Sequence, residues 1–113
     1  MSMDSVDAVV ARVRRGGATP HVADGSAART KLQMLDAIAA ALDFPAYFGR
    51  NLDALWDCLQ DLSWLPEGRH VLVWAEPQVL RDADPRTYEV IRGILGKATG
   101  GTGRPLTVEF ARG

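Results

Sequence analysis

The nearly unbroken apolar run His70-Val71-Leu72-Val73-Trp74 constrains the fold of this chain more than any other segment. A short run of this kind is typical of a strand that is covered on both faces. Such strands occur inside parallel sheets, where helices form the connections between strands and cover the sheet. We therefore expect an α/β domain built around residues 70–74.

Two further strands and three helices are expected around this run. The strands are residues 19–23, closed by the turn pair Asp24-Gly25, and residues 105–110, in which apolar positions alternate. Helical spacing of apolar residues extends from a cap at Ser26 to about Asp43, from Leu52 to Leu62, and from Pro85 to about Lys97. The order β-α-α-β-α-β predicts parallel strands joined by right-handed crossovers, hence a small two-layer α/β fold.

The length of 113 residues suits one domain with a single core. Residues 4–15 show a weaker helical pattern that ends at Gly16-Gly17. We therefore expect an N-terminal arm over residues 1–17, with a short helix, and a single domain over residues 18–113.

The charged residues are unevenly distributed although the formal net charge is only −1. Residues 36–84 hold nine acidic and three basic side chains, which gives −6, and the rest of the chain holds five acidic and ten basic ones, which gives +5. The absence of a basic excess argues against nucleic-acid binding. The asymmetry instead indicates an acidic face for a basic partner.

Several other classes are disfavoured by the sequence. The single cysteine, Cys58, excludes an internal disulfide and fits a small buried thiol in a reducing compartment. No signal peptide or membrane span is evident. His21 and His70 are isolated in the sequence, so neither a zinc site nor a cofactor is indicated. We expect a cytoplasmic protein that is monomeric when free.

Three aspartates recur at every fourth residue of the second predicted helix: Asp53, Asp57 and Asp61. They form one acidic line, opposite the face that carries its leucines, and Asn51 is a suitable N-cap for this helix. Like charges at this spacing oppose helix formation by roughly 0.2–0.5 kcal/mol per pair. Successive aspartates are ~6 Å apart along the axis, of the order of the phosphate spacing of an extended nucleic-acid strand.

Aromatic residues lie beside the acidic line. Tyr47 and Phe48 precede the helix, and Trp56 falls at the seam between its acidic and apolar faces. This mixture is typical of binding hot spots, although a solvated acidic face is a simpler alternative. An enzyme that uses two of the aspartates as acid and base is less favoured, because such pairs need unequal environments on opposite sides of a cleft.

The segment Phe44-Pro45-Ala46-Tyr47-Phe48-Gly49-Arg50-Asn51-Leu52-Asp53-Ala54-Leu55-Trp56-Asp57-Cys58-Leu59 closely resembles the signature of the barstar family, intracellular protein inhibitors of secreted microbial ribonucleases. The apolar strand ending in Trp74 and the final helix and strand also fit the family pattern, and the resemblance covers about residues 18–111. It implies a three-stranded parallel sheet with helices packed mainly on one side. It also implies an inhibitor without catalytic residues.

The resemblance also implies how a basic ribonuclease or related toxin would be blocked. Asp57 would enter the phosphate-binding pocket, Asp53 would meet a second basic patch, and Tyr47 and Trp56 would pack at the contact. The remaining expected partner-binding residues are Asn51, Asp61 and, on the third helix, Glu89, which follows the aligned Tyr88. Where family members often have Thr-Gly-Trp, this chain has Gln60-Asp61-Leu62, with Trp64 two positions late. A non-inhibitory interaction domain of the same fold, binding another basic protein surface, is the alternative.

Overall fold

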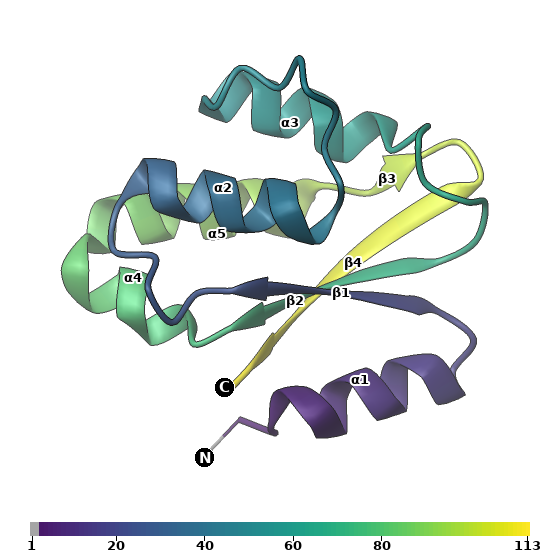
Figure 1. The fold of residues 1–113 in the computed structure, drawn as a ribbon, viewed down its shortest axis with the longest axis horizontal. Coiled ribbons are helices and arrows are strands. Elements are labelled where there is room, and N and C mark those ends of the chain that lie inside the picture. The colour runs from purple at the N-terminus through teal and green to yellow at the C-terminus, as the bar shows by residue number, and fades with distance from the viewer. Residues whose placement is uncertain (1–2) are drawn as a thin grey trace.

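A computed structural model describes residues 3–113. Its sheet has the strand order β1-β2-β4-β3 (Figure 1). The central strand β2 (His70–Ala75) is buried along its whole length, as its apolar sequence predicts. It pairs in parallel with β1 (Thr19–Asp24) and with β4 (Arg104–Ala111). The expected three-stranded parallel sheet is confirmed, and the two-residue strand β3 (Gly100–Gly101) adds an antiparallel pairing to β4.

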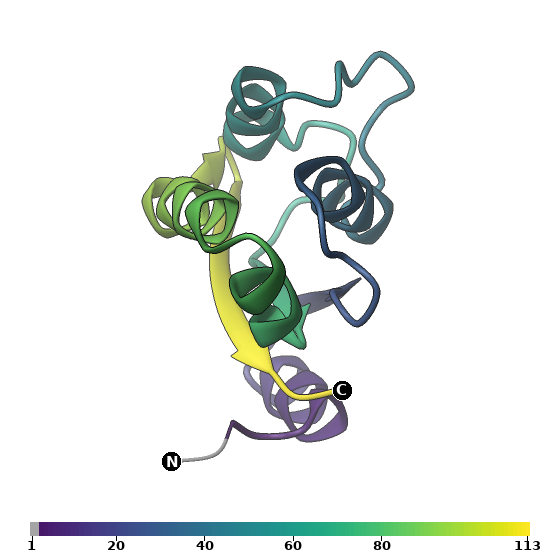
Figure 2. The same ribbon diagram turned by 90° about the vertical axis from the view of Figure 1, so that its left-hand side faces the viewer.

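The helices are divided unequally between the two faces of the sheet. Figures 1 and 2 show α2 (Lys31–Ala41), α3 (Leu52–Asp61), α4 (Pro77–Ala83) and α5 (Pro85–Lys97) on one side. Their buried side chains form the main core together with Leu72 and Trp74 of β2. Among residues 3–113, no helix is both long and apolar enough to cross a bilayer.

Helix α1 (Val6–Arg15) packs alone against the other face of the sheet (Figure 1). Its Val9 and Val13 form a second apolar cluster with Val71 and Val73 of β2. The alternation of side chains along β2 explains the division, because successive residues of a strand point to opposite faces. Residues that the sequence assigns to an arm therefore complete the burial of the central strand.

One local expectation about the helices was wrong, and one helix was not expected. The first long helix begins at Lys31 and is capped by Thr30, whose hydroxyl accepts a hydrogen bond from the Gln33 amide, and not by Ser26. Ser26 instead donates its amide to Asp24 in the turn that follows β1. Helix α4 was not expected, because it is a single short element that leads directly into α5. The predicted helix from Pro85 to Lys97 is confirmed.

Candidate acidic recognition surface

Helix α3 holds its aspartates outward because its leucines anchor the opposite face. Leu55 and Leu59 are fully buried in the main core. Asp53, Asp57 and Asp61 are all exposed. The three predicted carboxylates are thus exposed at intervals of one turn along α3, which is the top helix in Figure 1.

The aspartates of the acidic line form no ion pair with another side chain among residues 3–113. The ion pairs found among residues 3–113 join Arg12 to Glu109, Arg50 to Asp36, and Arg81 to Asp82. None of them includes an aspartate of α3. Arg50 is the nearest cation in the sequence, and its guanidinium makes two hydrogen bonds, of 2.8 and 2.9 Å, to the Asp36 carboxylate of α2. These hydrogen bonds and the charge of Asp36 raise the pKa of Arg50.

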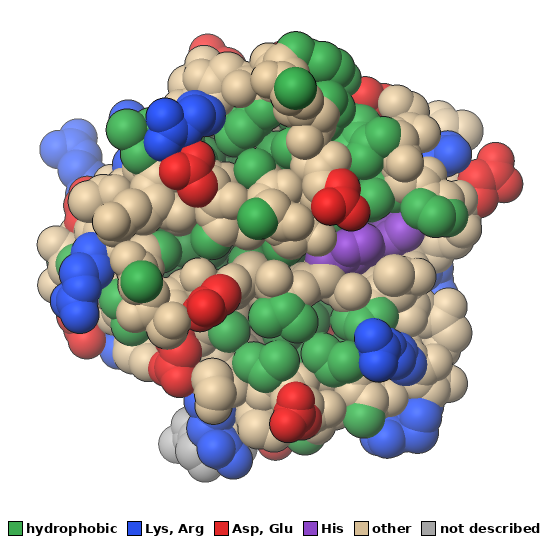
Figure 3. Space-filling view, in the orientation of Figure 1, with side chains coloured by type: hydrophobic (Ala, Val, Ile, Leu, Met, Phe, Trp, Pro, Cys, Tyr) green, Lys and Arg blue, Asp and Glu red, His purple; other side chains and the backbone are tan. Residues whose placement is uncertain are grey.

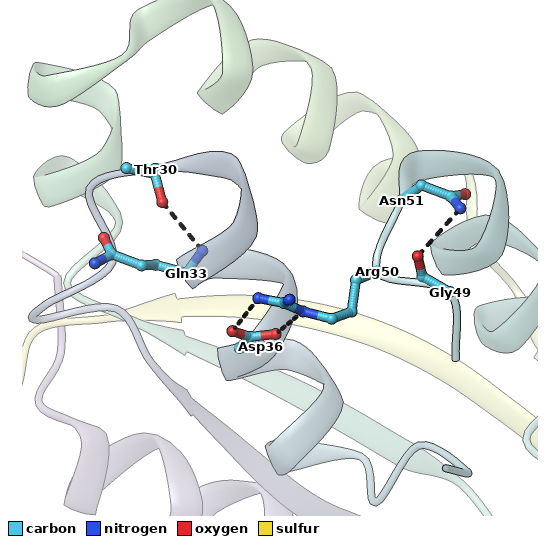
Figure 4. Close-up of polar contacts among 6 residues, drawn as sticks. All are labelled: Thr30, Gln33, Asp36, Gly49, Arg50 and Asn51. Atoms are coloured by element: carbon cyan, nitrogen blue, oxygen red, sulfur yellow. Dashed lines mark hydrogen bonds and ion pairs between the residues drawn. The ribbon is translucent and has the colours of Figure 1, made fainter. Parts of the chain in front are cut away.

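The loop between α2 and α3 is shaped by this ion pair (Figure 4). Asp43 and Arg50, near its two ends, both have φ of 52°, in the left-handed region that side chains other than glycine seldom adopt. The bidentate contact with Asp36 fixes the second of these residues. The loop is therefore held against α2 at the point where the chain enters α3.

Asn51 caps α3, as predicted. Its side-chain oxygen accepts a hydrogen bond of 2.8 Å from the Ala54 amide, and its side-chain nitrogen donates one of 3.3 Å to the Gly49 carbonyl (Figure 4). The amide therefore connects the loop to the first turn of the helix. The partner-binding role predicted for Asn51 stays a prediction, since its side chain is exposed but already serves this local structure.

Two aromatic side chains flank the aspartates. Tyr47, at the tip of the loop, is 75% exposed, and Trp56 of α3 is 36% exposed. Beneath the loop, Phe44 packs edge-on against both Phe48 and Trp64, with ring centroids 4.9 and 5.8 Å apart. These half-buried aromatic rings support the loop while Tyr47 and Trp56 remain available for contact.

Trp64 has a structural task in this arrangement. Its indole nitrogen donates a hydrogen bond of 2.8 Å to the Leu42 carbonyl, which follows the last residue of α2. The side chain is half-buried. Trp64 thus holds the start of the loop 42–51 by this hydrogen bond. Its position in the sequence did not indicate this role.

The C-terminal end of α3 is held by β3 and by the residue just before it. The Thr99 amide donates a hydrogen bond of 3.0 Å to the Gln60 side chain. Gly101 passes so close to the end of α3 that a Cβ atom there would lie 1.9 Å from the Asp61 carbonyl oxygen. The only signal in the sequence was the glycine pair itself.

Glu89 and Cys58 complete the set of residues singled out by the sequence. Glu89 is exposed on α5, whereas Tyr88 turns its ring toward Trp74, with centroids 5.5 Å apart. The expected burial of Cys58 is confirmed. Burial, followed by the charges of Asp61 and Asp57, raises the pKa of its thiol.

Comparison with known proteins places this chain in a family. A protein described as "Putative ribonuclease inhibitor YrdF", from Bacillus subtilis (strain 168), is 61% identical over 31 residues. That alignment covers 27% of this chain and 34% of the relative, so the match spans about a third of the relative's length. The family model for Barstar (barnase inhibitor) matches residues 18–111, which include the whole sheet, α2 to α5 and the acidic surface. The chain therefore belongs to the barstar family.

Proposed function

We propose that this protein inhibits a basic ribonuclease, or a related toxin, by covering its active site with α3 and the loop before it. The observation that carries the proposal is the exposed line Asp53, Asp57 and Asp61, which no cation among residues 3–113 neutralises by an ion pair. Carboxylates left without a partner in a free protein are suited to bind cations of another one.

The proposed mechanism is imitation of a polyanion. A nuclease active site binds phosphates through cationic side chains, and arginine binds carboxylate and phosphate with the same two-point geometry. Aspartates one helical turn apart present negative charges at ~6 Å intervals, close to the spacing of phosphates. The aspartates would therefore occupy the positions of RNA phosphates but offer no bond to cleave.

Rigidity of the surface supports inhibition over loose association. The capped start of α3, the Arg50–Asp36 pair and the Trp64–Leu42 bond hold the loop and the helix in one arrangement before any partner arrives. Less conformational entropy is lost on binding when a surface is already ordered. By the family resemblance, Asp57 enters the phosphate pocket and Asp53 meets a second basic patch.

Contacts outside the two central aspartates would extend the interface. Tyr47 and Trp56 would supply the apolar area, since exposed aromatic side chains are enriched at binding hot spots. Asn51, Asp61 and Glu89 would lie toward its rim. The family description and the name of the relative, both of which refer to ribonuclease inhibition, support this assignment of function.

Inhibition assays test the proposal directly. We expect the purified chain to suppress RNA cleavage by barnase, or by another small basic ribonuclease in a panel from the source organism, with a stoichiometry of one to one. Asp57→Ala is expected to weaken inhibition by about 2–5 kcal/mol, roughly 30- to 5000-fold in Kd, the range for desolvated charge pairs, for which the barnase–barstar complex is itself a source.

Asp82→Ala provides the matched control. Asp82 is an exposed aspartate of α4 that lies outside the acidic surface and pairs with the neighbouring Arg81. Its substitution changes the net charge by the same amount and should leave inhibition within about twofold, because an exposed pair joined by a single contact of 3.3 Å contributes little. If the two variants weaken inhibition equally, the overall charge of the protein and not the position of the aspartates on α3 determines binding. If the protein inhibits none of the basic ribonucleases tested, the proposed function is rejected.

A further inference from the structure

The two histidines, although 49 residues apart, form a hydrogen-bonded pair. His21 of β1 and His70 of β2 approach with His21 Nε2 2.9 Å from His70 Nδ1 and with ring centroids 5.0 Å apart. His70 is buried, and His21 is half-buried. On the face drawn in Figure 3, histidine reaches the surface in the seam between the sheet and the helical layer above it. The expectation that these residues are isolated holds for the sequence but not for the structure.

Each ring also faces a backbone carbonyl. His21 Nδ1 lies 3.2 Å from the Ala41 oxygen, and His70 Nε2 lies 2.8 Å from the Pro66 oxygen. The result is a chain of three links in the order carbonyl, imidazole, imidazole, carbonyl. A carbonyl can only accept, so each terminal link needs a proton on its ring nitrogen, and the central link needs one proton between the rings.

One protonation state alone satisfies all three of these hydrogen bonds. Two neutral rings carry two protons, which leaves either one carbonyl facing a lone pair or two lone pairs facing each other. Two imidazolium rings carry four protons, and two N–H groups then point at each other across 2.9 Å. Only the singly charged pair, with three protons, satisfies all three links.

We propose that His21 and His70 form a proton-dependent clamp on the base of the loop 42–51, which is complete only when the pair carries a single positive charge. Ala41 is the last residue of α2, and the loop begins immediately after it. The clamp joins β1, β2 and the segment before β2 to the end of α2. It is independent of any partner and therefore of the proposed function.

The charges around the pair favour one proton over two. Asp43, from the loop, stabilises a charge on His21, whereas burial and the charge of His70 oppose it and together lower the pKa of His21. On α2, the carboxylate of Asp36 is engaged by Arg50. Glu67 and Arg69, which precede His70 in the segment before β2, are exposed. The second proton therefore enters below the ordinary histidine pKa of about 6.5.

This order of protonation has a definite consequence for stability. In the unfolded chain His21 is protonated near the ordinary pKa of histidine. In the folded chain the pKa of His21 is lowered, so the ring is protonated only at a lower pH. The unfolded state then binds more protons, so the free energy of unfolding falls as the pH drops between these two values and levels off below the lower one.

The clamp acts on the loop together with a second anchor. His21 holds the Ala41 carbonyl, and Trp64 holds the carbonyl of the next residue, Leu42. The amide of Phe44 bonds back to Ala39 at 2.9 Å, which closes the end of α2. Loss of the link to His21 should therefore appear as faster exchange of the Phe44 amide hydrogen.

Nitrogen NMR of the imidazole rings tests the proton count on the unmodified protein. Only two histidines are present, so both signals belong to the pair. We expect two separate protonation steps of the pair, and between them three of the four ring nitrogens in the protonated form. Coincident steps, or two rings that each titrate as independent histidines, would overturn the clamp.

Hydrogen exchange tests the connection to the loop. Protection of the Phe44 amide, corrected for intrinsic exchange, should be greatest between the two steps and fall about fivefold outside them (about 1 kcal/mol, the net value of one hydrogen bond). His21→Gln, which can still donate to Ala41 but does not titrate, should abolish this dependence. Trp64→Phe, the matched control, should lower protection at every pH but keep the profile. If the pH dependence of Phe44 protection is unchanged in His21→Gln, the proposed coupling is overturned. If that variant does not fold, Phe44 protection that is independent of pH in the wild type would overturn the coupling.

Discussion

Asn51 occupies a position where capping of a helix and recognition of a partner would use the same side chain. Its amide oxygen is engaged by Ala54 and its amide nitrogen by Gly49, so the exposed group is already committed to the local structure. An effect of mutation on binding could therefore arise from a displaced helix start as well as from a lost contact. Suitable substitutions separate these two causes.

Asn51→Ala should lower the free energy of unfolding by about 1 kcal/mol, because the first turn of α3 loses its cap. Asn51→Asp should keep most of this stability, since aspartate caps helices about as well as asparagine does. Chemical denaturation provides the measurement. If Asn51→Asp restores stability but not inhibition, the amide contacts the partner, and if it restores both, the role of Asn51 is positional. Equal stability of Asn51→Ala and the wild type would contradict the capping role.

Some residue roles were predictable from local sequence and others were not. The cap at Asn51 and the outward direction of Asp53 follow from spacing along one helix. The pairing of Arg50 with Asp36 and that of His21 with His70 join separate segments, so only the folded chain brings them together. Helix α2 begins after Thr30 and not after Ser26, and apolar spacing alone did not distinguish these two hydroxyl residues as caps.

Helix α3 is fixed at both of its ends, and its C-terminal contact with β3 leaves no space for a side chain. Gly101 is half-buried, and a Cβ atom built there would lie 1.9 Å from the Asp61 carbonyl oxygen. The close approach aligns the last turn of the acidic line with the edge of the sheet. A change at Gly101 should therefore be transmitted directly to α3.

Gly101→Ala should destabilise the protein by about 1–3 kcal/mol, the usual cost of overpacking, and displace the end of α3. Gly93→Ala is the matched control, because Gly93 lies inside α5, where an added Cβ meets nothing within 4 Å. That substitution should stabilise the protein by about 0.5–1 kcal/mol through helix propensity. Thermal unfolding of both variants measures the contrast, and destabilisation of neither would contradict the close contact.

The Arg50–Asp36 pair has a different function, which is to hold the loop while turning a positive charge away from α3. Arg50→Ala removes both effects. The surface becomes more acidic, so association with a basic nuclease should accelerate, but the loop loses its tether, so dissociation should accelerate more. Stopped-flow kinetics separate the two rates. The pair exchange Arg50→Asp with Asp36→Arg should restore slow dissociation, and slow dissociation in Arg50→Ala would show that the tether is not needed.

Elements with a strong repeat were predicted well, whereas short elements defined by their neighbours were not. The buried strand at residues 70–75 and the helix after Pro85 follow from apolar spacing and from proline at the first turn. Helix α4 spans only seven residues and starts from Glu76 in a left-handed conformation, which nothing in the local pattern requires. Strand β3 exists only because β4 pairs with it.

The acidic and basic segments of the sequence are only partly separated in the folded molecule. Helix α1 directs Arg12 to Glu109 of β4 and buries its valines against the sheet, so the positive N-terminal segment lies on the face opposite α3 (Figure 1). The line of aspartates on α3 is thereby kept apart from those cations. A molecule of net charge −1 can thus present a locally strong negative field.

This separation predicts the salt dependence of inhibition. Raising the ionic strength from about 0.01 to about 1 M shortens the Debye length from about 30 Å to about 3 Å, so the association rate with a basic ribonuclease should fall roughly tenfold or more. The dissociation rate should change much less, because the contacts of the formed complex are desolvated. Stopped-flow measurements would also show a shallower dependence for Asp57→Ala than for Asp82→Ala. The net charge is nearly zero, so it cannot by itself cause a steep salt dependence. If Asp57→Ala reduces that dependence more than Asp82→Ala does, the dependence arises from the acidic line. An association rate unaffected by salt would contradict steering by this surface.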